Sequence, residues 1–152
     1  MKNLKRIFLS IAAFIFLIAL GLISGFLLQD KKKNLLVLEI GSQSFEVEIA
    51  DNALVQARGL SGRDSLPENR GMFFIFPDLG KRSFWMVGMK FPLDIIWIKG
   101  DRVVGFSENL PPAIALNTEL YSSPESVNKV LEINAGLVKK LNIREGDKIV
   151  LK

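Results

Sequence analysis

An uncharged apolar segment near the N-terminus constrains the fold of this chain more than any other feature. Residues 7–28, IFLSIAAFIFLIALGLISGFLL, contain no charged side chain over 22 positions. A helix of that length spans roughly 33 Å, which matches the hydrocarbon core of a bilayer. We therefore expect one transmembrane helix over residues 7–28, with the lipid bilayer as its partner. The folded domain must then form from the residues that follow.

The alternative interpretation of this segment is a cleaved signal peptide. The sequence ALG at residues 19–21 is a passable small-x-small cleavage site, but the apolar run continues well past it and exceeds a typical signal core. Basic residues occur both in the N-terminal flank (1–6) and in the polar linker (29–34), so charge alone does not fix the orientation. We expect a single-pass anchor in the cell membrane. The domain is expected on the extracytoplasmic side, because short N-terminal anchors commonly deliver the following domain there.

The composition of the chain removes several classes of function. It has no Cys and no His, which excludes disulfides, cysteine nucleophiles, Ser-His-Asp triads and the usual zinc sites. From residue 34 onward there are 14 Lys/Arg against 15 Asp/Glu, so the net charge of +4 comes from the flanks of the apolar segment. No basic stripe remains in the domain, and we expect no nucleic-acid partner.

Short alternating segments after the linker are typical of β-strands. Residues 35–41 and 45–49 predict a hairpin, because Phe45, Val47 and Ile49 fall on one face of the second strand. Further strands are expected at residues 72–76, 82–86, 93–98, 102–110, 129–133 and within 143–151, with a long loop over 113–128. A short helix is expected at residues 51–60, capped by Asp51 or Asn52 and ended by Gly59. A second is expected at residues 134–142, capped by Asn134.

This pattern favours a single globular domain over residues 35–152. About eight short strands and two short helices predict a mostly β (α+β) fold, a compact and small barrel-like domain. The helices do not alternate with the strands, which argues against a doubly wound parallel sheet.

Four segments, taken in order, are similar to one family of small bacterial and archaeal proteins: ARGLSGRDSLPENRGMFFIF, RSFWMVGMKFPLDIIWI, SENLPP and VLEINAGLVKKLNIREGDKI. Over roughly residues 40–150 the chain resembles domain-of-unknown-function family one hundred ninety-two. The resemblance implies a compact mostly β domain, often behind a signal or membrane anchor, and no agreed activity. The chain departs from the family at Val87, where members usually carry Lys, and at Gly88-Met89, where many carry Asn-Thr.

Asp94 is unusual because it lies within RSFWMVGMKFPLDIIWI, the most apolar segment of the domain. In an extended strand it shares a face with Ile96 and Ile98, and Glu108 similarly shares a face with apolar residues of the next strand. A buried carboxylate is costly unless it is paired, hydrogen-bonded or protonated. Asp94 therefore either anchors a loop, through an arginine or backbone amides, or orients a ligand in an apolar cleft. The candidate arginine partners are Arg58, Arg63 and Arg82.

The candidate ligand-binding site combines the two acids with a counter-charge and apolar surface: Arg58, Trp85, Met86, Asp94 and Glu108. Trp85 is included because large indoles often stay half exposed, whereas Phe84 and Phe91 are expected in the core. The leading hypothesis is a non-enzymatic accessory module. It would hold a small ligand or a partner segment, and we expect no cofactor and no metal.

Two other functions remain open. A hydrolase would use Asp94 and Glu108 as acid and base, and such pairs stand ~5–9.5 Å apart. A copper-binding protein would use Met86 and Met89, because thioethers are soft ligands that suit Cu(I). Against copper, methionine is also an ordinary residue of irregular cores.

Overall fold

The computed structural model describes residues 35–113 and 119–152. The expected N-terminal flank, transmembrane helix and linker lie outside these ranges. Across the two described ranges, no helix is long and apolar enough to cross a membrane. The globular part forms one compact unit over residues 34–152.

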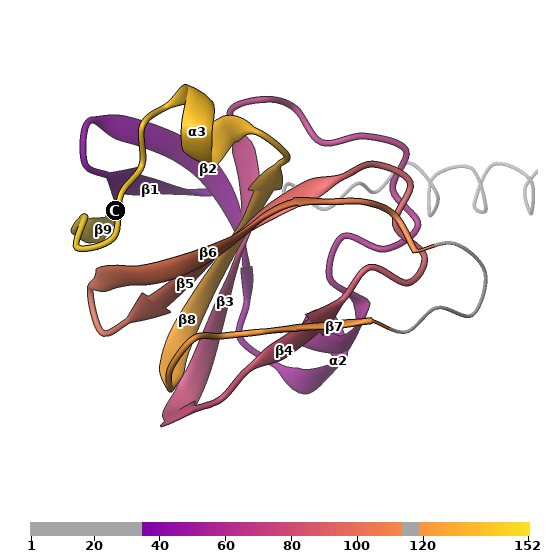
Figure 1. Cartoon of the computed structure of the whole chain (residues 1–152), viewed down its shortest axis with the longest axis horizontal. Coiled ribbons are helices and arrows are strands. Elements are labelled where there is room, and N and C mark those ends of the chain that lie inside the picture. Colours follow the sequence, from indigo (N-terminus) through magenta and orange to yellow (C-terminus); the bar gives the residue numbers. More distant parts are fainter. Residues whose placement is uncertain (1–34, 114–118) are drawn as a thin grey trace, which may run out of the picture. The chain divides into compact units, whose positions relative to one another are not determined.

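Nine strands and two short helices make up the described residues, which confirms the mostly β prediction (Figure 1). The strands are β1 (Leu36–Ile40), β2 (Gln43–Ala50), β3 (Arg70–Gly80), β4 (Ser83–Trp85), β5 (Leu93–Lys99), β6 (Arg102–Leu110), β7 (Leu120–Ser122), β8 (Val127–Asn134) and β9 (Ile149–Leu151). The helices are α2 (Ala53–Arg58) and α3 (Leu137–Lys140). The expected number of strands is one too low, because β7 lies in the segment expected to be a loop.

Seven strands form one sheet in the order β6-β5-β8-β3-β2-β1-β9, and β4 pairs with β7 in a separate small sheet. Only β2 and β3 run parallel among the described pairs, and the hairpin expected at the start of the domain is β1 with β2. A bridge between Arg102 and Lys148 connects the beginning of β6 to the turn before β9. There the Ile149 N–H donates to the Asp101 carbonyl at 2.8 Å. The sheet is therefore a half-barrel whose two edge strands meet at one end (Figure 1).

The two helices differ in how well local sequence explains them. α2 begins after Asn52, whose side chain accepts a hydrogen bond from the Val55 N–H at 3.1 Å, and it ends at Gly59 with φ of 52°. Both ends match expectation. The prediction that Asn134 caps the second helix is wrong, because α3 begins after Gly136. The Asn134 amide instead donates to the Leu66 carbonyl at 2.8 Å, which ties a loop to the end of β8.

Two clusters of buried side chains pack on opposite faces of the sheet. The α3-side cluster includes Phe73, Leu131 and the α3 residue Val138. The β4-side cluster includes Phe74, Met86, Met89 and Val130, and Phe84 of β4 packs against it. β5 contributes to both by alternation: Ile96 and Ile98 join the first cluster, and Ile95 and Trp97 join the second.

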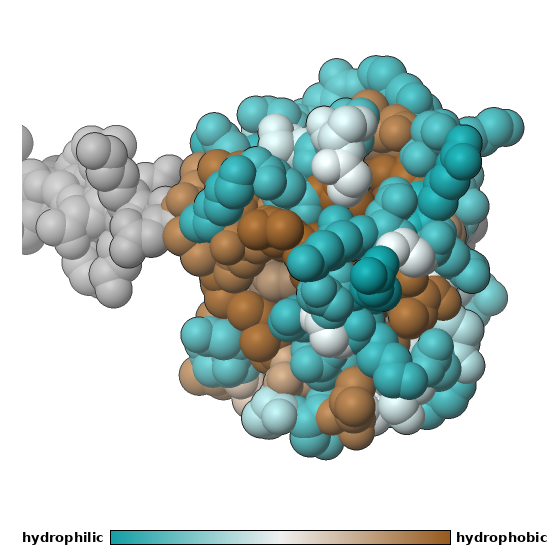
Figure 2. All heavy atoms as spheres, turned by 90° about the vertical axis from the view of Figure 1, so that its left-hand side faces the viewer, coloured by the Kyte–Doolittle hydropathy of each residue, from teal (hydrophilic) through white to brown (hydrophobic). Residues whose placement is uncertain are grey.

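The surface is mostly polar with scattered apolar side chains. Figure 2 shows the face on the side of β1 and β9, where apolar side chains gather in places between hydrophilic ones. On these strands Val37, Val150 and Leu151 are partly exposed. Single exposed apolar side chains of this kind are ordinary for a folded domain.

Candidate functional site

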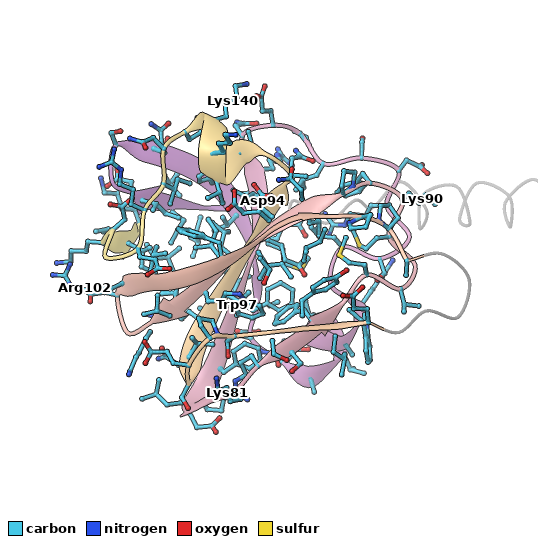
Figure 3. All side chains as sticks on the ribbon, viewed as in Figure 1. Lys81, Lys90, Asp94, Trp97, Arg102 and Lys140 are labelled. Carbon is cyan, nitrogen blue, oxygen red and sulfur yellow. The ribbon has the colours of Figure 1, made fainter. Side chains whose placement is uncertain are left out.

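Asp94 is fully buried, and the backbone satisfies both of its carboxylate oxygens. The Asn109 N–H donates to Oδ1 at 2.8 Å, and the Val138 N–H donates to Oδ2 at 3.0 Å. Asp94 thus joins β5 to the end of β6 and to the first turn of α3, on the α3 side of the sheet (Figure 3). The hypothesis that Asp94 anchors a loop through backbone amides is confirmed. None of the candidate arginines donates to it.

Glu108 does not lie on an apolar face, and that prediction is wrong. Leu93 pairs with Leu110 and Ile95 pairs with Ser107, so Glu108 and Asn109 together face Asp94 in a β-bulge. Asn109 adopts a positive φ of 55° in this bulge. The extra residue breaks the strict alternation of β6 and leaves the Glu108 side chain exposed.

A pocket of about 350 Å³ lies on the other side of the sheet, beside α2 and β4. Four aromatic side chains from β3 and β4 form part of its walls: Phe74, Phe76, Phe84 and Trp85. Phe84 packs edge-on against Phe74 at 4.8 Å between ring centroids and against Trp97 at 5.7 Å. Trp85 is 53% exposed, so it forms part of the mouth. We call this cavity the α2–β4 pocket.

Glu132 of β8 lines the α2–β4 pocket and is only 6% exposed. Within the described residues, no hydrogen bond reaches its buried Oε2 atom. Burial raises the pKa of Glu132 to about 8, although the nearby Arg63 guanidinium acts to lower it. The carboxyl group is therefore mostly protonated at pH 7, when it can both donate and accept a hydrogen bond.

Arg63 does not neutralise Glu132, because it is already engaged by another carboxylate. Its guanidinium donates two hydrogen bonds to Glu48 of β2, at 2.6 and 2.7 Å. These bonds raise the pKa of Arg63 above its usual value. Bidentate pairs of this kind are strong and directional, so they leave little capacity for a second carboxylate.

Three basic side chains also line the pocket. Lys81 donates to the carbonyls of Ser123 and Pro124, and Arg82 lies over the Phe76 ring at 4.2 Å while donating to Asp78. Arg58, at the end of α2, is exposed, and its guanidinium has no hydrogen-bond or ion-pair partner among the described residues. Arg58 is therefore the cation most available to a ligand.

The family of the chain follows from its sequence profile. Residues 36–151 match DUF192, a family described as uncharacterized ACR. The chain belongs to this family. The resemblance identified from the four sequence segments is confirmed.

Two solved structures are similar in fold to this DUF192 domain, and one further relative is similar in sequence. A UPF0127 protein of Thermococcus gammatolerans is 31% identical over 106 residues, which cover 68% of this chain but only 64% of that protein. The chain thus spans slightly less than two thirds of that relative. A protein of unknown function from Novosphingobium aromaticivorans has a crystal structure with a TM-score of 0.69, at 30% identity over 75% of this chain and 83% of the other. A Sinorhizobium meliloti protein, described as a candidate transcription regulator, has a TM-score of 0.70 at 28% identity over 76% and 92%.

The DUF192 domain brings together only part of the site expected from sequence. Arg58 and Trp85 line the α2–β4 pocket, and Met86 is buried in the β4-side cluster that adjoins it. Asp94 and Glu108 are not among the lining residues. The physical reason is alternation in β5, which directs Asp94 to the α3 side of the sheet.

Glu132 is the pocket residue that the sequence analysis missed. The same signal that identified Asp94 was present, since Glu132 stands between Leu131 and Ile133 in the apolar strand VLEI. Strand alternation places it on the face of Val130, which belongs to the β4-side cluster. An acid on that face of a buried strand is therefore the same kind of signal as Asp94.

Neither alternative function gains support from the geometry. Asp94 has no exposed surface and both its oxygens are occupied, so it cannot reach a substrate as the hydrolase hypothesis requires. Met86 and Met89 are 3% and 8% exposed and pack with apolar neighbours. Among the described residues, no group of three or more His, Cys, Asp or Glu side chains could hold a metal ion.

Proposed function

We propose that this DUF192 domain is a non-enzymatic binding module for a small molecule, and that its site is the α2–β4 pocket. The observation that carries the proposal is the buried Glu132 carboxyl at an aromatic-walled cavity, with an oxygen that no described group satisfies. Unsatisfied buried polar atoms are rare and costly in folded proteins. A ligand that hydrogen-bonds Glu132 would remove this cost.

The size and lining of the pocket support the same role. Small-molecule sites are mostly apolar cavities of about 300–1,000 Å³ with a few polar groups that fix orientation. The α2–β4 pocket has a volume of about 350 Å³ and combines four aromatic side chains with Glu132 and the available Arg58. Among its described lining residues Glu132 is the one acidic group, whereas a two-carboxylate hydrolase needs a second.

Fluorine NMR of the full-length chain in mild detergent tests the proposal directly. The chain has two tryptophans, and Trp85 lies at the pocket whereas Trp97 is fully buried. 5-Fluorotryptophan labelling therefore gives two ¹⁹F resonances, of which one reports pocket occupancy. A fragment library with acids, amides and amines equally represented should include compounds that shift the Trp85 resonance saturably.

A pair of variants on α2 provides the control. Ala57 lines the pocket and is exposed on the helix, so Ala57→Phe should fill the mouth and abolish the shifts. Leu54, which is 85% exposed and does not line the pocket, provides Leu54→Phe, which should leave the shifts unchanged. The proposal is wrong if no fragment shifts Trp85, or if the shifts persist in Ala57→Phe.

We further propose that the module is anchored in the cell membrane by residues 7–28 and faces the extracytoplasmic side. The uncharged run of 22 residues supports this location. Resistance of the native chain to alkaline carbonate extraction, with the domain accessible to external protease, is the expected result. Recovery of a mature protein that begins after the apolar segment would show a cleaved signal instead.

A further inference from the structure

We infer that the ligand of the α2–β4 pocket is a small organic acid. Its anionic group would bind between the Arg58 guanidinium and the Glu132 carboxyl, and its apolar body would pack against the aromatic wall. This inference rests on the proposed binding function and adds the chemical class of the ligand.

The charge balance of the lining residues is the first argument. Three basic residues, Arg58, Lys81 and Arg82, line the pocket together with a single acidic residue. Arg82 is paired with the Asp78 carboxylate, whereas Lys81 donates only to backbone carbonyls among the described residues, so the charges of Lys81 and Arg58 still act on the cavity. A low-dielectric wall strengthens that effect, so the cavity attracts an anion and disfavours a cation.

The C-terminal end of α2, where Arg58 lies, is close to Glu132. Gly59 directly follows Arg58, and a methyl group placed on Gly59 would lie 3.8 Å from Oε2 of Glu132. The same methyl would lie 3.7 Å from Cζ of Phe74. The backbone that carries Arg58 therefore lies close to both a carboxyl group and an aromatic ring.

The groups around the Glu132 carboxyl determine whether it carries a proton. Arg63 and Glu48, which face it from the loop after α2 and from β2, form a neutral pair with each other. In the sheet its neighbours are apolar, Met72 on β3 and Ile95 on β5. Arg82 is likewise paired with Asp78, so Arg58 and Lys81 carry the remaining charge on this cavity. Because burial raises the pKa of Glu132 to about 8, its O–H can donate to an anionic ligand at neutral pH.

An organic ammonium ion is the competing ligand class, because aromatic faces and carboxylates both attract cations. It would have to enter a cavity that already contains three basic side chains and would need Glu132 to lose its proton. Both requirements disfavour it, and the two classes predict opposite pH dependence. Binding of an acid weakens as Glu132 ionises, whereas binding of an ammonium ion strengthens.

Three probes of equal size and different charge decide between these classes: benzoate, benzamide and benzylamine. Their Kd values are measured on the full-length chain by the ¹⁹F shift of Trp85. At pH 6.5 we expect benzoate to bind at least about tenfold more tightly than either neutral or cationic analogue. At pH 9.5, above the pKa of about 8, most of Glu132 has lost its proton, so the benzoate Kd should rise severalfold or more while that of benzamide stays constant.

Variants identify the two groups that bind the anion. Glu132→Gln should keep the preference for benzoate and abolish its pH dependence. Arg58→Gln should raise the Kd of benzoate about tenfold and leave the Kd of benzamide unchanged. Because Arg58 is exposed, this variant still tests the proposal if Glu132→Gln fails to fold. Arg144→Gln, at an exposed arginine that does not line the pocket, is the matched control and should have no effect.

The outcomes separate failure of this inference from failure of the binding function. Tighter binding of benzylamine than benzoate, equal binding of benzoate and benzamide, or a benzoate Kd that does not respond to pH would overturn the assignment of an organic acid. In those cases the pocket still binds small molecules. Absence of a Trp85 shift with every fragment of the library would overturn the binding function itself.

Discussion

Asp94 and Glu132 lie on adjacent strands of one sheet, and each is surrounded by apolar residues. They differ in what satisfies their oxygens. Asp94 receives backbone N–H groups from Asn109 and Val138, whereas no hydrogen bond from a described residue reaches Oε2 of Glu132. The first carboxylate faces α3, and the second faces a cavity.

This difference distinguishes a structural acid from a candidate binding group. Backbone donors that converge on Asp94 stabilise the folded state and fix the bulge and the helix that supply them. A carboxyl group without such donors lowers stability, and sites retained for function commonly show that trade-off. Exchanging each carboxyl for an amide, which preserves shape, should therefore have opposite effects at the two positions.

The largest expected effect is on the pH dependence of stability through Glu132. Its folded-state pKa of about 8 exceeds the ordinary value of 4.5, so its contribution to stability is complete below pH 4.5 and is lost as pH rises to 8. The full shift corresponds to at most about 5 kcal/mol. Urea unfolding of the full-length chain should show Glu132→Gln gaining stability over wild type by several kcal/mol between pH 5 and pH 9.

Other titrating groups do not obscure this measurement. Asp64 and Glu68 also have shifted pKa values, lowered by Lys90 and Lys140, but they are the same in both proteins and cancel in the difference. Parallel stability curves for wild type and Glu132→Gln would show that Glu132 does not titrate in this range. The proposed difference between Asp94 and Glu132 in their effect on stability would then be wrong.

The second effect is a loss of stability in Asp94→Asn. The amide keeps one acceptor but directs an NH₂ group at the second backbone N–H, so one charged hydrogen bond is lost and a buried donor is left unpaired. We expect a decrease of about 3 kcal/mol in the free energy of unfolding at pH 7. Amide hydrogen exchange at Asn109 and Val138 should also become faster. A variant as stable as wild type would contradict the structural role of Asp94.

The smallest effect is expected at Glu108, which lies beside Asp94 in the chain fold but is exposed. Glu108→Gln should change the free energy of unfolding by less than about 0.5 kcal/mol. It should also leave ligand-induced shifts of Trp85 unchanged, because Glu108 does not line the pocket. A large decrease in the free energy of unfolding, or loss of the Trp85 shifts, would contradict this. Either result would support the prediction that Glu108 acts together with Asp94.

The sequence predicts those helices and strands that depend on interactions between residues close together in the chain. The first hairpin follows from alternation in FEVEI, and α2 follows from Asn52 and Gly59 at its ends. β7 could not be found in this way, because Leu120–Ser122 is a strand only through its pairing with β4. Partners distant in sequence decide such elements.

The candidate site was predictable to a similar degree. Alternation correctly identified Asp94 as buried, but its partner Val138 is a backbone amide 44 positions away that no side-chain pattern reveals. Arg58 and Trp85, which were expected in one cleft with Asp94, both line the α2–β4 pocket, whereas Asp94 does not. Which face of the sheet carries the cavity depends on how α2 and β4 cover it, and that is a property of the tertiary structure.

The join between the two edges of the half-barrel has a consequence for how the domain is made. β1 pairs on one side with β2, its neighbour in sequence, and on the other with β9, the last strand of the domain. During synthesis β1 therefore remains an open edge until β9 has emerged, and such non-local pairing is slow to form. Until β9 pairs with it, the exposed edge of β1 is the segment that a chaperone would need to protect.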